Sequence, residues 1–290
     1  MSHTIEETTI ETSGLEFAAL TCGDGDDAAL LLHGFPDSPH TFEPLLERLA
    51  DAGYTAVAPY MRGYGDTERP AVEPGNYTPL MLGSDVFSLL GTFDDDDPLV
   101  VGHDWGAIAA TTAAASNGSQ FGTCVTMAVP PNFMPQLDDY AGQALRSWYM
   151  TEFQIPGHGE DILRRDDFAL IDRLWRLWSP DWTKDEAHLE RIKETFRTGE
   201  TVEAALMYYR DFFDMFLSRP RDQLEIGGID VPTLLLAGAH DGCISADLFE
   251  TAPECYDARV ELEVLNNAGH FHHAERPDAV ADRILSFVDS

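Results

Sequence analysis

The sequence predicts an α/β fold in which a mostly parallel, doubly wound sheet is interrupted by a long helical insertion. Short apolar runs that suit buried strands alternate with longer segments of helical periodicity, first over residues 1–131 and again from about residue 224. Between them, residues 132–223 show helical periodicity only. We therefore expect a core domain built from residues 1–131 and 224–290, with residues 132–223 forming a helical cap (lid) domain.

The expected elements follow in order along the chain. Two alternating segments, 5–11 and 15–21, predict an antiparallel hairpin. Strands are expected at 29–32, 54–58, 99–102, 123–128, 233–237 and 260–264, and helices of the core at 41–52, 79–92 and 105–115. Strands that alternate with helices in this way indicate a parallel sheet.

The segment Gly102-His103-Asp104-Trp105-Gly106 lies between a predicted strand and a predicted helix. Glycines on both sides allow a sharp turn and keep other side chains away from its apex, which is the setting of a nucleophile elbow. Here the apex residue is Asp104. A carboxylate in this place can displace a leaving group from an sp3 carbon and form an ester, whereas serine would indicate acyl transfer.

Asp241 and His270 follow two later strands, at 233–237 and 260–264. Because the carboxyl ends of parallel strands meet at one edge of the sheet, we expect both side chains near Asp104. The order nucleophile, acid, histidine is that of a hydrolase triad. Each residue also has a structural interpretation: Asp241 precedes a glycine and could form a turn, and His270 could be a core histidine.

The segment His33-Gly34-Phe35-Pro36 follows the strand at 29–32. A loop in this position can offer a backbone N–H, here that of Phe35, to a developing oxyanion. The N–H of Trp105 is expected to be the second donor. We include His33, Phe35 and Trp105 among the candidate oxyanion and substrate-binding residues.

The net charge is extreme, because 51 Asp and Glu face 18 Lys and Arg, giving −33 at pH 7. Such a surface repels nucleic acid and anionic membranes, so neither is expected as a partner. Self-repulsion at this level would weaken the fold at low ionic strength, which leads us to expect a halophilic protein. The acidic run at 94–97 precedes the elbow strand and is expected to be solvated and remote from the chemistry.

The sequence shows neither a signal peptide nor an apolar run long enough to cross a bilayer. Its four cysteines form no C-x-x-C pair, which favours a reduced, cytoplasmic location. No metal-ligand spacing or phosphate loop is present, so we expect no metal and no cofactor. The neighbouring His272 and His273 are not expected to bind a metal, because adjacent side chains point in different directions.

With these segments together, the chain resembles the α/β-hydrolase superfamily over essentially its whole length, and within it the epoxide hydrolases with a helical cap. The segment from His33 to Pro36 is similar to their H-G-x-P oxyanion loop, and residues 102–107 are similar to their aspartate elbow. Residues 62–65, Arg-Gly-Tyr-Gly, match their R-G-x-G loop. The resemblance implies an α/β-hydrolase fold that acts on a small-molecule substrate.

The resemblance also implies two cap tyrosines that activate an epoxide. Tyr149 stands five residues before a Q-x-P-G segment, and Tyr209 lies in a Y-Y-R segment, as in that family. The implied reaction opens the epoxide to a vicinal diol: the phenols bind the epoxide oxygen, Asp104 forms an ester, and water activated by His270 hydrolyses it. Aromatic residues at helical spacing usually pack, so a purely structural role for both tyrosines is the alternative.

Three other functions stay open. A haloalkane dehalogenase uses the same Asp-His-Asp triad and Trp105 could hold its halide, although Phe35 occupies the place where many such enzymes offer asparagine. A fluoroacetate-type dehalogenase would need arginines where this chain has Trp105 and Ile108. A ligand-binding protein of this fold without turnover is the third, and the complete set of triad and oxyanion residues argues against it. The natural substrate, the selectivity and the oligomeric state are not predicted.

Overall fold

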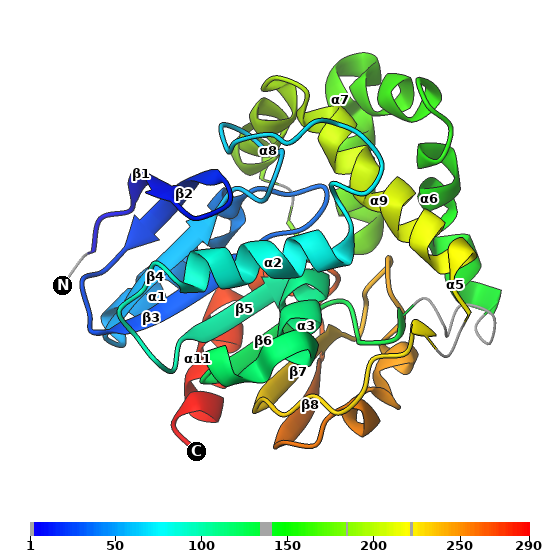
Figure 1. The fold of residues 1–290 in the computed structure, drawn as a ribbon. Helices are drawn as coiled ribbons and strands as arrows, with labels where there is room; N and C mark the ends of the chain where they lie inside the picture. Colours follow the sequence, from blue (N-terminus) through cyan, green and yellow to red (C-terminus); the bar gives the residue numbers. More distant parts are fainter. Residues whose placement is uncertain (1–2, 134–140, 184, 221–222) are drawn as a thin grey trace.

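A single eight-stranded sheet forms the centre of the molecule (Figure 1). This computed structural model describes residues 3–133, 141–183, 185–220 and 223–290. The strand order is β1-β2-β4-β3-β5-β6-β7-β8, with β1 and β2 antiparallel to each other, β2 antiparallel to β4, and all other neighbours parallel. The strands are β1 (Glu6–Glu11), β2 (Glu16–Cys22), β3 (Asp27–Leu32), β4 (Tyr54–Pro59), β5 (Leu99–His103), β6 (Thr123–Met127), β7 (Thr233–Gly238) and β8 (Val260–Leu265). The mostly parallel sheet that the sequence predicts is confirmed.

Helices cover both faces of the sheet, and this explains why the central strands are apolar throughout. In β3, Leu30 and Leu32 pack into the core on the side of α2 (Pro79–Leu90) and α3 (Trp105–Asn117). Ala29 and Leu31 pack into a second core with α1 (Glu43–Asp51) and α11 (Pro277–Val288). Successive side chains of a strand point to opposite faces, so one apolar run supplies both cores.

The expected elements of the core are found, with small shifts at their ends. The hairpin of β1 and β2 pairs Ile10 with Phe17. The helix expected at 41–52 is divided into a 3-10 turn, η1 (Pro39–Phe42), and α1, which has a proline in its first turn where a helix loses no hydrogen bond to it. The 94–97 run is not merely solvated, since the Asp95 carboxylate accepts the backbone N–H of Ala28 at 2.8 Å and so holds the start of β3.

Every element described between β6 and β7 is a helix, and these helices lie together at one end of the sheet (Figure 1). They are α5 (Ala141–Arg146), α6 (Trp148–Phe153), α7 (His158–Trp178), α8 (Glu186–Arg197) and α9 (Thr201–Ser218). After β8 the chain forms the short helix α10 (His272–Glu275) before α11. Within the described residues, no helix combines the length and the apolar composition needed to cross a membrane.

Polar contacts fix the inserted helices to the core. The carboxylate of Asp211 in α9 accepts backbone N–H groups of Gly75 at 2.9 Å and Tyr77 at 2.8 Å. The indole N–H of Trp175 in α7 donates to the carbonyl of Pro36 at 2.8 Å. These bonds are largely buried, so they hold the inserted helices in one position against the loops that follow β3 and β4.

Candidate active site

Asp104 forms the apex of the turn between β5 and α3. Its φ of 52° and ψ of −114° are strained for a residue with a side chain, and such strain is typical of functional turns. Two glycines make the turn possible. A Cβ on Gly34 would lie 2.3 Å from the Asp104 side chain, and a Cβ on Gly106 would lie 2.0 Å from the carbonyl oxygen of Leu32. The elbow and the loop after β3 can therefore approach each other only with glycine in both places.

The two oxygens of the Asp104 carboxylate have different surroundings. Oδ1 accepts the backbone N–H of Phe35 at 2.8 Å. Oδ2 lies 3.7 Å from Nε2 of His270, which is longer than a hydrogen bond between these atoms. Within the described chain, Nε2 of His270 has no other hydrogen-bond partner. One oxygen is therefore held by the loop, and the other faces an imidazole nitrogen that is free to act on a third group.

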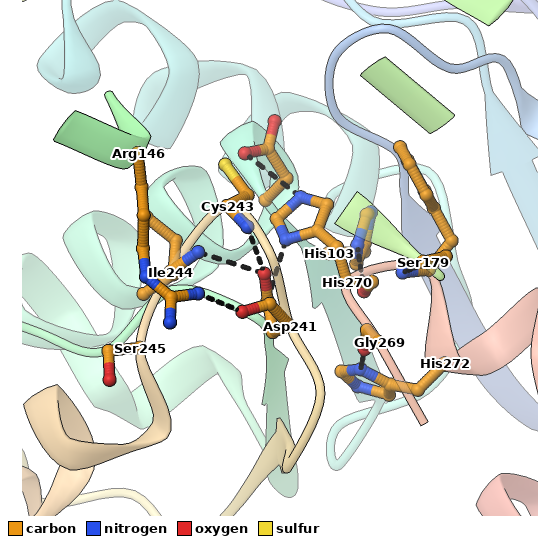
Figure 2. A network of polar contacts seen from close by, with 12 residues as sticks. His103, Arg146, Ser179, Asp241, Cys243, Ile244, Ser245, Gly269, His270 and His272 are labelled. Atoms are coloured by element: carbon orange, nitrogen blue, oxygen red, sulfur yellow. Dashed lines mark hydrogen bonds and ion pairs between the residues drawn. The ribbon is translucent and has the colours of Figure 1, made fainter. Parts of the chain in front are cut away.

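Asp241 fixes the orientation of His270, as Figure 2 shows. Its Oδ2 accepts a hydrogen bond from Nδ1 of His270 at 2.9 Å. Its Oδ1 accepts the backbone N–H groups of Cys243 at 2.6 Å and Ile244 at 2.8 Å. Because Nδ1 donates its proton to a carboxylate, Nε2 is the nitrogen turned toward Asp104.

The charge of His270 depends on its two carboxylate neighbours. Burial alone would lower the pKa of its imidazole, but the carboxylates of Asp241 and Asp104 outweigh burial and raise the pKa to about 10. The ring is therefore cationic at neutral pH before Asp104 forms an ester. Conversion of Asp104 to a neutral ester removes one of these two negative charges. The pKa of His270 then falls, and the imidazolium releases its proton more readily.

Tyr149 and Tyr209 come from different helices of the insertion and meet beside the elbow. Their ring centroids lie 5.7 Å apart in an edge-to-face arrangement. The Tyr209 ring also contacts Phe35 at 5.3 Å and Trp105 at 5.0 Å. Trp178 links the Tyr149 ring to the triad, because it contacts Tyr149 at 5.0 Å and His270 at 5.1 Å.

The two phenol groups differ in their hydrogen bonds. The Tyr149 hydroxyl lies 3.5 Å from the sulfur of Cys243, whereas the buried Tyr209 hydroxyl has no well-aligned hydrogen bond among the described residues and interacts with the Trp105 side chain. Burial, more than the charge of Asp104, raises the pKa of both tyrosines well above the ordinary value. Both are therefore protonated at neutral pH and can act as hydrogen-bond donors.

The three candidate residues of the oxyanion region occupy distinct positions. Phe35 supplies the N–H already described, and its ring packs against Phe153, Phe196 and Tyr209. Trp105 is the first residue of α3, where a backbone N–H has no acceptor within its helix. The ring of His33 serves the backbone instead: Nε2 accepts the N–H of Met61 at 3.1 Å, and burial lowers its pKa to about 4.

Residues that the sequence patterns do not mark also shape the site. The carbonyl of Trp178 at the end of α7 accepts the N–H groups of Gly242 at 3.0 Å and His270 at 2.9 Å, and thereby joins both triad loops. The Gln143 side chain in α5 donates to the carbonyl of Cys243 at 2.6 Å, and Arg146 donates to the carbonyl of Asp241 (Figure 2). These contacts depend on how the insertion folds back over the core, so no local sequence pattern predicts them.

An apolar pocket with a cavity volume of about 80 Å³ lies next to the elbow, between α3, α9 and the segments that enter and leave the insertion. It is lined by Pro79, Ala107, Ile108, Thr111, Thr112, Val129, Pro130, Pro131, Asn132, Phe133, Phe212, Met215, Phe216, Leu224 and Ile226. Asp104 and the two tyrosines do not line it. The ring of Trp105 contacts Phe212, one of the residues that line the pocket, at 5.5 Å.

Several named proteins are similar to this chain over nearly its whole length. Epoxide hydrolase 2 of Siraitia grosvenorii is 33% identical, with 98% of each chain covered. Epoxide hydrolase A of Mycobacterium tuberculosis is 28% identical, with 97% of each chain covered. The crystal structure of epoxide hydrolase A from Mycobacterium thermoresistibile superimposes with a TM-score of 0.82 at 26% identity, covering 99% of both chains.

A family model described as the alpha/beta hydrolase family matches residues 29–283, which include both parts of the sheet and the insertion. The strand order, the strained elbow and the triad agree with that match. The chain therefore belongs to the alpha/beta hydrolase family and is a hydrolase.

Proposed function

We propose that the protein hydrolyses an epoxide to a vicinal diol through an ester on Asp104. The observation that carries this proposal is the pairing of a carboxylate nucleophile with two buried, protonated phenols that meet beside the Phe35 and Trp105 rings. An epoxide needs both groups, because its alkoxide leaving group is poor unless an acid protonates it. The names of the relatives support the same activity.

In the first step, the Tyr149 and Tyr209 hydroxyls hold the epoxide oxygen. Oδ2 of Asp104 attacks a ring carbon from the opposite side, the C–O bond breaks, and a phenol gives its proton to the alkoxide. His270 now loses the charge that stabilised its extra proton, and returns that proton to the phenolate. The intermediate is a hydroxyalkyl ester with neutral His270.

In the second step, His270 takes a proton from water, and the hydroxide attacks the carbonyl carbon of the ester. Oδ1 of Asp104 becomes the oxyanion, and the Phe35 N–H that already binds it remains in place, with the Trp105 N–H as the second donor. Collapse releases the diol and restores the Asp104 carboxylate and the imidazolium. Asp241 holds the His270 ring throughout both steps.

The pocket beside the elbow supports a substrate with an apolar substituent. Its walls are almost entirely aliphatic and aromatic, with Thr111, Thr112 and Asn132 the polar exceptions. An alkyl or aryl group of the epoxide that lies there would remove apolar area from water and add binding energy. The cap boundaries at residues 132–223 fit this arrangement, because the pocket lies where the insertion joins the core.

The test is a panel of three substrates assayed with the wild type and with Asp104→Asn. We expect diol from styrene oxide, little bromide from 1-bromobutane and no fluoride from fluoroacetate, with activity lost in the variant. Halide release faster than diol release would instead assign the triad to a haloalkane dehalogenase. Turnover of none of the three, with a folded protein, would contradict the proposal and favour a binding role.

We also propose that the enzyme works in concentrated salt inside a reducing cytoplasm. Cations on the surface are so few that several contact two carboxylates each: Arg197 lies within 2.7 Å of Asp167 and Glu190. The remaining acidic side chains repel one another, and salt screens this repulsion. The four cysteines are buried and free, as a reducing compartment requires.

A further inference from the structure

Three catalytic loops meet at a second polar cluster that the proposed reaction does not use. Asp37 follows the oxyanion loop, His103 precedes the nucleophile, and His273 follows the catalytic histidine by three residues. All three side chains are buried, with exposed fractions of at most 1%. One coordinating atom of each residue lies within 4.8 Å of those of the other two.

The hydrogen bonds around this cluster leave a ring nitrogen of His103 and a carboxylate oxygen of Asp37 facing each other without a proton between them. Nε2 of His103 lies 3.0 Å from the carbonyl oxygen of His270, so this nitrogen carries the proton. The other ring nitrogen, Nδ1, then has a bare lone pair when the ring is neutral. That lone pair faces Oδ2 of Asp37 at 3.9 Å, and neither atom has a hydrogen-bond partner in the described residues.

The third residue adds another unpartnered nitrogen. Nε2 of His273 lies 3.5 Å from the same carboxylate oxygen. Neither of its ring nitrogens has a partner in the described part of the chain. A buried carboxylate faced by two neutral imidazoles is costly, and a cation bound between them would offset that cost.

We propose that Asp37, His103 and His273 bind a divalent transition metal ion, with Zn²⁺ the ion whose preferred ligands they match. Zinc bonds of about 2.0–2.2 Å in a tetrahedral site place ligand atoms roughly 3.3–3.6 Å apart. The two separations from Asp37 Oδ2, 3.5 Å to His273 and 3.9 Å to His103, need shifts of only a few tenths of an ångström, and the two imidazole nitrogens, which lie within 4.8 Å of each other, would close in further around the ion. Two imidazoles and one carboxylate are a common protein ligand set for zinc.

The groups behind two of the three ligands, Asp37 and His103, are arranged as metal sites require. The other carboxylate oxygen of Asp37 accepts the N–H of Ser38 at 2.8 Å and the hydroxyl of Thr41, which fixes Oδ2 toward the histidines. His103 donates its other ring N–H to a backbone carbonyl, the usual partner of a metal-bound histidine. The ligands are therefore oriented before the ion binds.

The ion has a structural role, since it lies behind the triad. It joins the loop of Phe35, the turn of Asp104 and the loop of His270 to one another. Adjacent His272 and His273 hide this site in the sequence: only one of them points into the cluster, and its partners lie far away along the chain. This departs from the expectation that the sequence holds no metal site.

The test measures metal directly and needs no enzyme activity. The protein is unfolded in guanidinium with EDTA and refolded with Zn²⁺, with Co²⁺ or without metal. After gel filtration we expect about one zinc per chain by mass spectrometry, visible absorption bands in the cobalt form, and a midpoint of thermal unfolding higher by on the order of 5 °C than that of the metal-free form.

Two variants locate the ion. His273→Gln should lose the zinc and the cobalt bands, whereas His272→Gln should keep both, because His272 is equally buried but lies outside the cluster. Circular dichroism confirms that each variant is folded, and Asp37→Asn replaces His273→Gln if that variant is not. Less than about a tenth of a zinc per chain in the wild type, or equal zinc in both histidine variants, would overturn the proposal.

Discussion

Replacement of Tyr209 by phenylalanine is expected to make the protein more stable and less active. The Tyr209 side chain is 2% exposed, and its hydroxyl has no well-aligned hydrogen bond in the described chain. A hydroxyl buried in this way lowers the stability of the fold, yet the proposed reaction uses it as an acid. Tyr209→Phe removes that single oxygen and leaves the ring contacts in place.

The size of both effects follows from the surroundings of the hydroxyl. A buried donor without a partner costs about 1–3 kcal/mol, so its removal should raise the unfolding free energy by at least about 1 kcal/mol. For a chain of this size, that corresponds to a rise of about 2–4 °C in Tm. Loss of one donor to the charge that develops on the oxygen should lower kcat about 100-fold, because Tyr149 remains.

The neighbouring residue provides a matched control. Tyr208 is equally buried, but its hydroxyl donates to the carbonyl of Arg62 at 2.9 Å and belongs to the packing of the cap on the core. Tyr208→Phe should therefore lower the unfolding free energy by about 1 kcal/mol or more and leave kcat within a few-fold of the wild type.

The assay combines denaturant unfolding, followed by circular dichroism, with diol formation from styrene oxide. Both kcat and kcat/KM of Tyr209→Phe should fall together, because the lost interaction is made in the transition state. If Tyr209→Phe retained full activity, or were less stable than the wild type, the role given to this hydroxyl would be wrong.

The remaining predictions concern the triad, the thiol and the surface. The His270→Gln variant should form the ester on Asp104 but not hydrolyse it. Intact-protein mass spectrometry should therefore show the mass of the protein increased by that of one substrate molecule, and an unchanged mass would contradict the covalent step. The folded pKa of His270 is raised from 6.5 to about 10, so its contribution to stability is complete below about pH 6.5 and is lost as the pH rises through 10. The unfolding free energy measured from pH 6 to 10 should therefore fall in the wild type and change less in His270→Gln. Parallel curves for the two proteins would show that His270 does not cause the pH dependence of stability. Cys243→Val should lower kcat several-fold in the wild type but not in a Tyr149→Phe background, because the thiol acts through that hydroxyl, and additive losses would refute this coupling. Finally, the midpoint of thermal unfolding should rise between dilute buffer and molar KCl, and an unchanged midpoint would argue against a halophilic protein.

Local patterns were sufficient for the core, and they also pointed to the three residues that we propose as the triad. The strand before Asp104 and the helix after it were both predictable, because an apolar run and an alanine-rich segment differ in periodicity. The convergence of Asp241 and His270 followed from one rule, that the carboxyl ends of parallel strands share an edge. The resemblance to epoxide hydrolases pointed to Tyr149 and Tyr209, which the fold brings within ring contact.

The cap contacts were not predictable in the same way. Trp178 joins both triad loops through its backbone carbonyl, and any residue at the end of α7 would carry the same atom. Gln143 and Cys243 meet because α5 folds back onto the loop after β7. Such contacts join distant segments through single atoms and leave no periodicity in the sequence.

The sequence alone determined the order of strands and helices, the acidic surface and the residue types of the triad, since these depend on periodicity, composition and spacing along the chain. The tertiary structure decided which nitrogen of His270 faces Asp104, which phenol lacks a well-aligned hydrogen bond, and that Asp37, His103 and His273 share one buried space. The reason is physical: hydrogen-bond satisfaction and desolvation depend on the distances between atoms in three dimensions, which only the folded chain sets.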